Sequence, residues 1–235
     1  IDLYIDNKNL PCFYVDYLCI DKKYRKQNLA QSIITHMANN GFVDYFKLFI
    51  FKKELFPLPF KFISKYNYYI INRKEIQNTY DNLTKIDKNI KEENIMELYK
   101  FYTEYIINHR LYNKYHYQEF KHYFQNDSVS FYRNKIGNLN ILIAIYDSKI
   151  NYHKTKTADF LFIIINNKEK YQISIEEIIN KEAYKNNYFL INNMSQNEEY
   201  IKIKKLEKIS QCFLHFYNYH KENRINSKDL CLNIP

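Results

Sequence analysis

Hydrophobic and polar positions alternate early in the chain and then change to a helical period. After the turn-like residues 7–11, residues 12–20 alternate aromatic and aliphatic side chains, which predicts a mostly buried strand. Beyond the polar turn at residues 21–28, apolar residues at positions 29, 33, 34 and 37 recur at helical spacing, and residues 45–51 predict a second strand. Strand, helix and strand in this order are typical of a right-handed crossover unit in an α/β fold.

The second part of the chain begins after a polar segment at residues 82–93. Apolar positions recur at helical spacing over residues 95–106 and 117–124, which predicts two helices. We expect strands at residues 129–133, 139–146, 159–165, 188–191 and 213–219, and helices at residues 175–184 and 198–206. Consecutive strands should pair antiparallel and crossover strands parallel, giving a mixed α/β sheet with flanking helices. We therefore expect two units, residues 1–82 and residues 83–235.

The composition indicates a folded protein and excludes nucleotide binding by a glycine loop. Hydrophobic residues make up 46% of the 235 residues, which is enough for a sizeable core. The two glycines, Gly41 and Gly137, lie far apart, whereas the dinucleotide fingerprint and the P-loop need several glycines close together. A phosphate would therefore have to be bound by another device.

The net charge of +9 favours an anionic partner, such as a phosphorylated cofactor, a nucleic acid or a membrane surface. The lysines are scattered along the chain rather than clustered. Scattered lysines are more typical of a solvated surface than of a nucleic-acid interface, so we expect no nucleic-acid partner.

Neither the cysteines nor the seven histidines are spaced as metal ligands. The four cysteines are Cys12, Cys19, Cys212 and Cys231. We expect reduced thiols, no metal and no permanently bound cofactor, with Cys19 a small apolar residue rather than a nucleophile. No apolar run reaches membrane-spanning length and no signal peptide opens the chain, which predicts a cytoplasmic protein without a transmembrane segment. We also expect a monomer, and a chain that starts at Ile1 suggests a fragment of a longer protein.

The segment with the clearest chemistry joins the first predicted strand to the first predicted helix. A basic turn, Lys22-Lys23-Tyr24-Arg25-Lys26, precedes a helix that begins near Asn28. Unpaired backbone N–H groups at a helix start, beside cationic side chains, bind pyrophosphate without a glycine loop. The pattern Arg25-x-x-Asn28-x-Ala30 is similar to the Arg-x-x-Gly-x-Gly/Ala signature of GNAT-type acyltransferases, with Asn in place of the central Gly. The alternative interpretation is a charged loop that caps a surface helix.

The wider segment, residues 15–34, closely resembles a motif of the N-myristoyltransferase family. In that motif a strand Ile-Asn-Phe-Leu-Cys-Val-His-Lys-Lys precedes Leu-Arg-Ser-Lys-Arg-Leu-Ala-Pro-Val-Leu-Ile. Six residues match it: Cys19, Lys22, Lys23, Arg25, Leu29 and Ala30. Three further segments resemble family motifs: Phe56-Pro57-Leu58-Pro59 (Leu-Pro-x-Pro), Ala158-Asp159-Phe160-Leu161 (Thr-Asp-Phe-Leu) and Phe216-Tyr217-Asn218-Tyr219-His220 (Tyr-x-Tyr-Asn-Trp). The resemblance thus extends over nearly the whole chain.

The resemblance implies a pseudo-symmetric pair of GNAT-like halves. Residues 1–82 would complete an acyl-CoA-binding half whose opening portion lies before Ile1, and residues 83–235 would form the peptide side. The family transfers a myristoyl group from myristoyl-CoA, its co-substrate, directly to the N-terminal glycine amine of a protein or peptide. By resemblance, the N–H groups of Tyr17 and Leu18 would contact the cofactor and hold the oxyanion, and the carboxylate of Pro235 would be the base. The pyrophosphate would be bound by Arg25, Lys26, Gln27, Asn28, Leu29 and Ala30.

The chain also departs from the family's pattern. Where the family has Ser-Lys-Arg, this chain has Lys26-Gln27-Asn28, and where the family has Asn before the oxyanion pair, it has Asp16. The family's Tyr-Trp-His-Arg-Ser-Leu-Asn-Pro block is replaced by the different sequence of residues 65–72. The family's glycine-rich turn corresponds to residues 207–211, which contain no Gly. Three alternatives therefore stay open: a catalytically impaired relative, a GNAT-type N-acetyltransferase for another amine, and a basic nucleic-acid-binding domain.

Two further expectations concern the tail of the chain and Asp159. The apolar residues Leu230, Cys231, Leu232 and Ile234 predict that the tail returns into the molecule rather than trailing in solvent. Asp159 is expected at one end of its strand.

Overall fold

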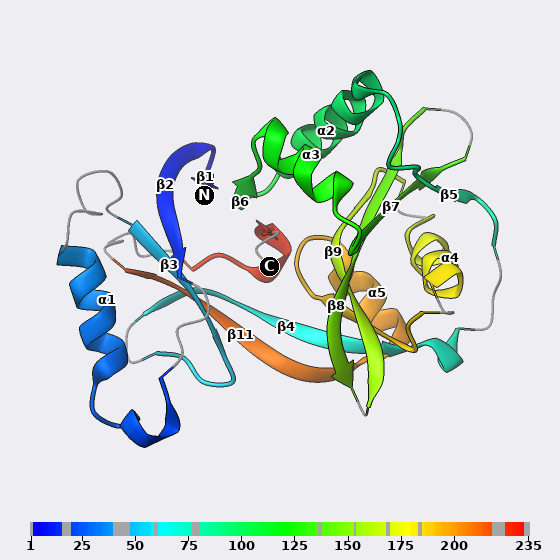
Figure 1. The fold of residues 1–235 in the computed structure, drawn as a ribbon. Helices are drawn as coiled ribbons and strands as arrows, with labels where there is room; N and C mark the ends of the chain where they lie inside the picture. Colours follow the sequence, from blue (N-terminus) through cyan, green and yellow to red (C-terminus); the bar gives the residue numbers. More distant parts are fainter. Residues whose placement is uncertain are drawn as a thin grey trace.

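The computed structural model describes residues 2–15, 20–39, 48–58, 61–76, 80–135, 138–152, 154–167, 170–182, 185–217 and 224–232. Its strands form a mixed sheet of twelve strands with flanking helices (Figure 1). The strands are β1 (Asp2–Ile5), β2 (Lys8–Val15), β3 (Leu48–Glu54), β4 (Phe62–Asn72), β5 (Leu83–Lys85), β6 (Leu111–Lys114), β7 (Val129–Asn134), β8 (Ile141–Tyr152), β9 (Thr155–Ile165), β10 (Tyr188–Asn192), β11 (Glu207–Tyr217) and β12 (Leu230–Cys231). The helices are α1 (Leu29–Asn39), α2 (Glu92–Ile106), α3 (Tyr117–Gln125), α4 (Tyr171–Glu182) and α5 (Asn197–Lys204), with short 3-10 turns η1 (Lys22–Tyr24), η3 (Arg73–Glu75) and η5 (Ser227–Asp229).

The strand order reveals two related units. The strands lie in the order β12-β6-β1-β2-β3-β11-β4-β10-β9-β8-β7-β5. In each unit a crossover helix joins a parallel pair: α1 joins β2 to β3, and α4 joins β9 to β10. An antiparallel partner flanks each pair on its outer side, β1 beside β2 and β8 beside β9. The predicted fold class, a pseudo-symmetric mixed α/β sheet, is confirmed.

The two units exchange strands at the centre of the sheet. β4 follows the first unit in the chain but pairs with β10, whereas β11 closes the second unit but pairs with β3. β4 and β11 also pair with each other, and Figure 1 shows them side by side between α1 on one side and α4 and α5 on the other. The division at residues 82 and 83 stays a prediction. Because β4 and β11 are exchanged, each unit of the sheet contains one strand that the order along the chain would assign to the other unit.

Helices pack on both faces of the sheet in the second unit. One core lies between the sheet and α4 and α5, and contains Ile143, Ile163 and Ile178. The other core lies between the sheet and α2 and α3, and contains Leu142 and Ile164. Neighbouring residues of β8 and of β9 thus point to opposite cores, as the period of two in a strand requires. Burial on both faces explains why these strands read as continuous apolar runs in the sequence.

The crossover expected near the start of the chain is confirmed, with different strand bounds. β2 begins at Lys8, because the hairpin turn is formed by Asp6 and Asn7, whose φ values are 48° and 63°. Pro11 therefore lies inside β2, and the turn expected at residues 7–11 is wrong in its position. Pro11 pairs only with β1, since the pairing with β3 begins one residue later, so its missing N–H interrupts no hydrogen bond to β3. Residues 16–19 and 45–47, predicted as strand, lie outside the described residues.

Several strands were not predicted from the sequence: the short strands β1, β5, β6 and β12, the long strand β4, and the first part of β11. Residues 62–72 form β4, whose apolar alternation is obscured by tyrosines on both faces. The turn expected at residues 207–211 is also wrong, because these residues begin β11, with Glu207 opposite Ile70. β11 needs this extra length because it pairs along β4 and, further on, along β3. A strand that crosses two partners leaves no signal in its local sequence.

The chain end packs against the first unit. β12 pairs in parallel with β6, with Leu230 opposite Leu111. The segment before it is anchored at Ile225, whose N–H donates to the Ile63 carbonyl and whose carbonyl accepts from Ser64, at 2.9 and 2.6 Å. The predicted return of the tail is confirmed for the buried residues Leu230, Cys231 and Leu232, whereas Ile234 lies outside the described residues.

Candidate functional site

The turn before α1 is closed by its own backbone and side-chain contacts. Asp21 caps η1: its carboxylate accepts from the Lys23 N–H at 3.0 Å, and its carbonyl accepts from the Tyr24 N–H at 2.9 Å. Arg25 folds back, and its Nε donates to the Ile20 carbonyl at 3.0 Å. The backbone of the turn is thereby fixed, while the side chains of residues 21–29 remain exposed.

Two residues of this turn have left-handed backbones, Lys26 with φ 67° and Asn28 with φ 56°. This conformation costs a residue with a Cβ about 1–2 kcal/mol, and Asn is among those that adopt it most readily. Asn28 stands where the acyl-CoA signature has Gly, and its left-handed backbone is the conformation that Gly adopts most readily. Its carbonyl accepts the Ser32 N–H at 3.0 Å, which is the first hydrogen bond of α1.

This geometry leaves hydrogen-bond donors at the start of α1. The N–H groups of Leu29 and Ala30 have no partner within the helix, because no earlier helical carbonyl faces them. Among the described residues, Lys22, Arg25 and Lys26 form no ion pair with an acidic side chain. Backbone donors and unpaired cations at one helix N-terminus form an arrangement that binds phosphate oxygens.

The residues predicted to bind pyrophosphate therefore lie in the turn before α1 and in the first two residues of α1. Arg25, Lys26, Gln27, Asn28 and Leu29 are exposed, and Ala30 is half-buried. A polar hollow of about 520 Å³ is lined by Asn28 and by residues further along α1, including Ser32 and His36. The predicted catalytic residues Tyr17, Leu18 and Pro235 lie outside the described residues.

The second unit contains a strand irregularity in β9. β9 has a bulge at Leu161, which has no partner on β8, because Phe160 and Phe162 pair with consecutive residues there. The bulge lies just past Asp159, the last residue of β9 in register with β10. Residues 230–232 of the tail help to line a small cavity beside the bulge.

Asp159 is a titratable residue whose position the sequence analysis predicted wrongly. It lies inside β9, opposite Tyr146 of β8 and Leu190 of β10, and not at the end of a strand. Its Oδ1 atom is buried and has no hydrogen-bond partner among the described residues. Burial raises the pKa of its carboxyl to about 7, and the charge of Lys52 offsets this only in part. A carboxyl that titrates near pH 7 can accept a proton from an α-amine, whose own pKa is about 8.

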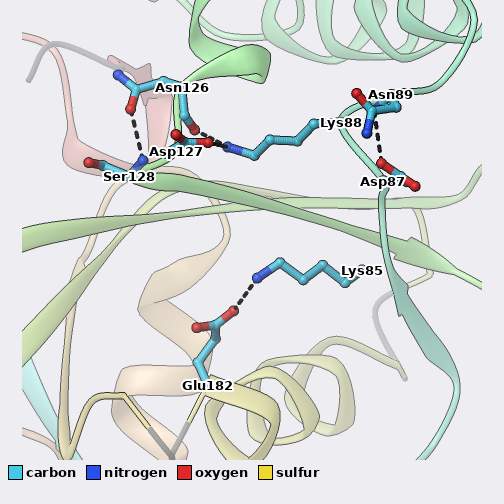
Figure 2. A network of polar contacts seen from close by, with 8 residues as sticks. All are labelled: Lys85, Asp87, Lys88, Asn89, Asn126, Asp127, Ser128 and Glu182. Carbon is cyan, nitrogen blue, oxygen red and sulfur yellow. Dashed lines mark hydrogen bonds and ion pairs between the residues drawn. The ribbon is translucent and has the colours of Figure 1, made fainter.

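A second group of charged residues holds the segment around β5 in place. Buried Glu182 of α4 accepts a hydrogen bond from the Tyr132 hydroxyl and pairs with Lys85 at 3.3 Å (Figure 2). Lys88 donates to the Asn126 carbonyl and lies 3.7 Å from the carboxylate of Asp127. Because each of these charges has a partner inside the network, the group is structural rather than a ligand site.

The described part of the chain offers neither a cluster of metal ligands nor a helix that could span a membrane. There, no three His, Cys, Asp or Glu side chains gather closely enough to hold a metal ion. Cys12, Cys212 and Cys231 are buried free thiols. None of the helices within the described ranges has both the length and the apolar character that a bilayer span requires.

No protein-family model matches the chain, and no curated protein matches its sequence significantly. Solved structures do match its fold. Two structures of Saccharomyces cerevisiae N-myristoyltransferase with bound myristoyl-CoA are similar, with TM-scores of 0.76 and 0.75 and 13% identity; the match covers 97% of this chain and 67% and 64% of theirs. A GCN5-related N-acetyltransferase from Anabaena variabilis ATCC 29413 has a TM-score of 0.59 at 11% identity, covering 91% of this chain and 56% of that one. The chain thus has a GNAT-like fold and spans about two thirds of the length of the N-myristoyltransferases.

Proposed function

We propose that this protein is an N-acyltransferase that takes its acyl group from acyl-CoA. The observation that carries the proposal is the turn before α1, where left-handed Asn28 lies beside Arg25 and the unpaired N–H groups of the helix. A pyrophosphate there would accept hydrogen bonds from the backbone and from the guanidinium, and the helix dipole would stabilise its charge. The bound myristoyl-CoA of the similar yeast structures supports the proposal.

The family resemblance suggests the finer reaction. We propose that the acyl group is myristoyl and that its acceptor is the N-terminal glycine amine of a protein or peptide, with a cytoplasmic monomer as the active form. The amine would attack the thioester carbonyl directly, and the thiolate of CoA would leave. The N–H groups of Tyr17 and Leu18 would hold the oxyanion, each contributing about 2.7–4 kcal/mol, and the carboxylate of Pro235 would accept the amine proton.

Mass spectrometry tests this function directly. Full-length protein is mixed with acyl-CoAs of several chain lengths and a peptide that begins with glycine, and the peptide is expected to gain one myristoyl group. The same peptide with an acetylated N-terminus serves as the control and should gain nothing. Transfer of acetyl groups to another amine would favour the N-acetyltransferase alternative. Acyl-CoA binding without any transfer would favour the impaired relative.

Replacing Arg25 with alanine should weaken acyl-CoA binding by about 1.5–3 kcal/mol, the contribution of a hydrogen bond to a charged group. Isothermal titration calorimetry measures the affinity. Lys23→Ala is the matched control: Lys23 belongs to the same turn, but its Nζ lies 4.6 Å from the centre of the Tyr24 ring. The control should bind nearly as tightly as the wild type. Equal affinities for the wild type and Arg25→Ala would contradict the proposed pyrophosphate site.

The net charge of +9 allows a second test of partner type. If the positive charge binds the phosphates of CoA and keeps the protein soluble, binding to arbitrary duplex DNA should be weak and should vanish at physiological salt. A gel-shift titration at increasing salt measures this. Tight, sequence-dependent binding at physiological salt would instead favour the nucleic-acid-binding alternative.

A further inference from the structure

A serine between β10 and α5 has a strained backbone. Ser195 has a φ of 54°, in the left-handed region, although it carries a Cβ. Its N–H donates to the Ser227 carbonyl at 3.2 Å, which holds the loop against the last segment of the chain. A strand followed by a strained serine and then a helix is the local arrangement of a nucleophile elbow, in which a sharp turn exposes the serine hydroxyl.

Tyr105, in the last turn of α2, and His109, in the turn just beyond it, contact this hydroxyl. His109 Nε2 lies 2.8 Å from Ser195 Oγ, and the Tyr105 hydroxyl lies 2.5 Å from it. His109 Nδ1 lies 3.3 Å from the Ile106 carbonyl, which can only accept a hydrogen bond. We therefore assign the proton to Nδ1, so that Nε2 accepts from Ser195. Burial lowers the pKa of His109, which favours the neutral imidazole needed for a base.

Ser195 lines both a small cavity beside the β9 bulge and a larger hollow. The cavity beside the β9 bulge measures about 20 Å³ and has room for no more than a water molecule. The hollow measures about 520 Å³, the size of a small-molecule pocket. Its lining includes Tyr171, Tyr200, Ile203, Glu198, Glu199 and Lys202. Because two carboxylates and one ammonium line the hollow, its lining has a net negative charge, which disfavours the phosphates of CoA. The aromatic and aliphatic side chains suit an uncharged ligand.

We propose that Ser195 and His109 form a nucleophile and general-base pair that hydrolyses small uncharged carboxylic esters entering from this hollow. Ser195 Oγ bonds to the ester carbonyl carbon while its proton moves to His109 Nε2, and the alkoxide leaves with that proton as the ester C–O bond breaks. Water then attacks the acyl-serine, passing one proton through His109 back to Oγ, and the carboxylic acid departs. Tyr105 is a positioning residue that donates to Oγ.

An uncharged alkyl fluorophosphonate, which forms a covalent bond with activated serines, tests this pair. Peptide mass spectrometry should locate the adduct on Ser195, and Ser195→Ala should abolish it. His109→Gln keeps a hydrogen-bonding side chain beside Oγ but removes the base, so labelling should slow by about 100-fold or more. Tyr105→Phe should slow labelling less. Ser128→Ala, which removes a half-buried serine at another turn, is the control and should label at the wild-type rate.

Two outcomes would overturn the proposal. One is a folded wild-type protein that forms no adduct at Ser195, which would mean that the cluster only ties α2 to the loop. The other is labelling at the same rate in His109→Gln, verified as folded by circular dichroism. The rates at which the variants hydrolyse p-nitrophenyl acetate should rank in the same order as their rates of labelling. Since neither assay contains CoA or an amine, failure here would leave the proposed N-acyltransferase activity untouched.

Discussion

Asp159→Asn is expected to stabilise the folded protein at pH 8 by on the order of 4 kcal/mol and to change little near pH 4. Burial raises the pKa of this carboxyl from 3.8 to about 7, so the folded state binds the proton more tightly than the unfolded state. The stability contributed by the protonated carboxyl is therefore fully present below about pH 4 and is lost as the pH rises to about 7. Each unit of pKa shift corresponds to about 1.4 kcal/mol, and asparagine cannot ionise.

Urea denaturation at pH 4 and pH 8 measures the two free energies of unfolding. Asp127→Asn is the matched control, because its carboxylate is fully exposed at the turn shown in Figure 2. The control should change stability by less than about 0.5 kcal/mol at either pH. A stabilisation by Asp159→Asn that is equal at both pH values would mean that ionisation of the buried carboxyl is not its cause.

The sequence allows the crossover units and most helices to be predicted, because their signal is local. α2, for example, buries Ile95, Leu98, Tyr102 and Ile106 at helical spacing. β4 could not be predicted in this way, since its burial depends on β10 and β11, which come much later in the chain. One side-chain hydrogen bond between these central strands, from Gln211 to Asn67, joins residues 144 positions apart. No window of sequence contains both partners of such a contact.

The same difference between local and long-range signals decides which parts of the candidate sites could be predicted from the sequence. The basic turn could be predicted because Arg25 and Asn28 are neighbours in the chain. The pair of His109 and Ser195 could not, because 86 positions separate them and neither stands in a recognisable motif. The buried state of Asp159 depends on the strands at its two sides, which the run of residues 159–165 does not reveal.

The internal symmetry explains why only the first unit is proposed to bind phosphate. Both units have a crossover helix after a long strand, but α4 is packed into a core, with Ile175 and Ile178 fully buried. α1 is much more open, and Leu29 and Ile33 are 36% and 40% exposed. A bulky anion needs access to the helix start and cationic side chains around it. Among the described residues, the start of α1 meets both requirements.

Extending the chain beyond Pro235 by a few residues is expected to slow acyl transfer by about 10²–10⁴-fold, the usual contribution of a general base. Under the proposed mechanism, the carboxylate of Pro235 removes the amine proton, and an extension converts it into a peptide bond that cannot accept one. Deleting residues 232–235 should have the same effect on transfer. Acyl-CoA binding should stay nearly intact in both variants, because the turn before α1 is unchanged.

The expected loss is specific to one end of the chain, so the same extension placed at the N-terminus of the full-length protein is the control and should leave the rate of transfer unchanged. Mass spectrometry of the acylated peptide gives the rate, and calorimetry gives the affinity for acyl-CoA. The buried residues Leu230 and Leu232 show that the tail returns into the molecule as far as residue 232. If a protein extended beyond Pro235 transfers acyl groups at the native rate, another base must act, and Asp159, with a pKa of about 7, would be the first residue to test.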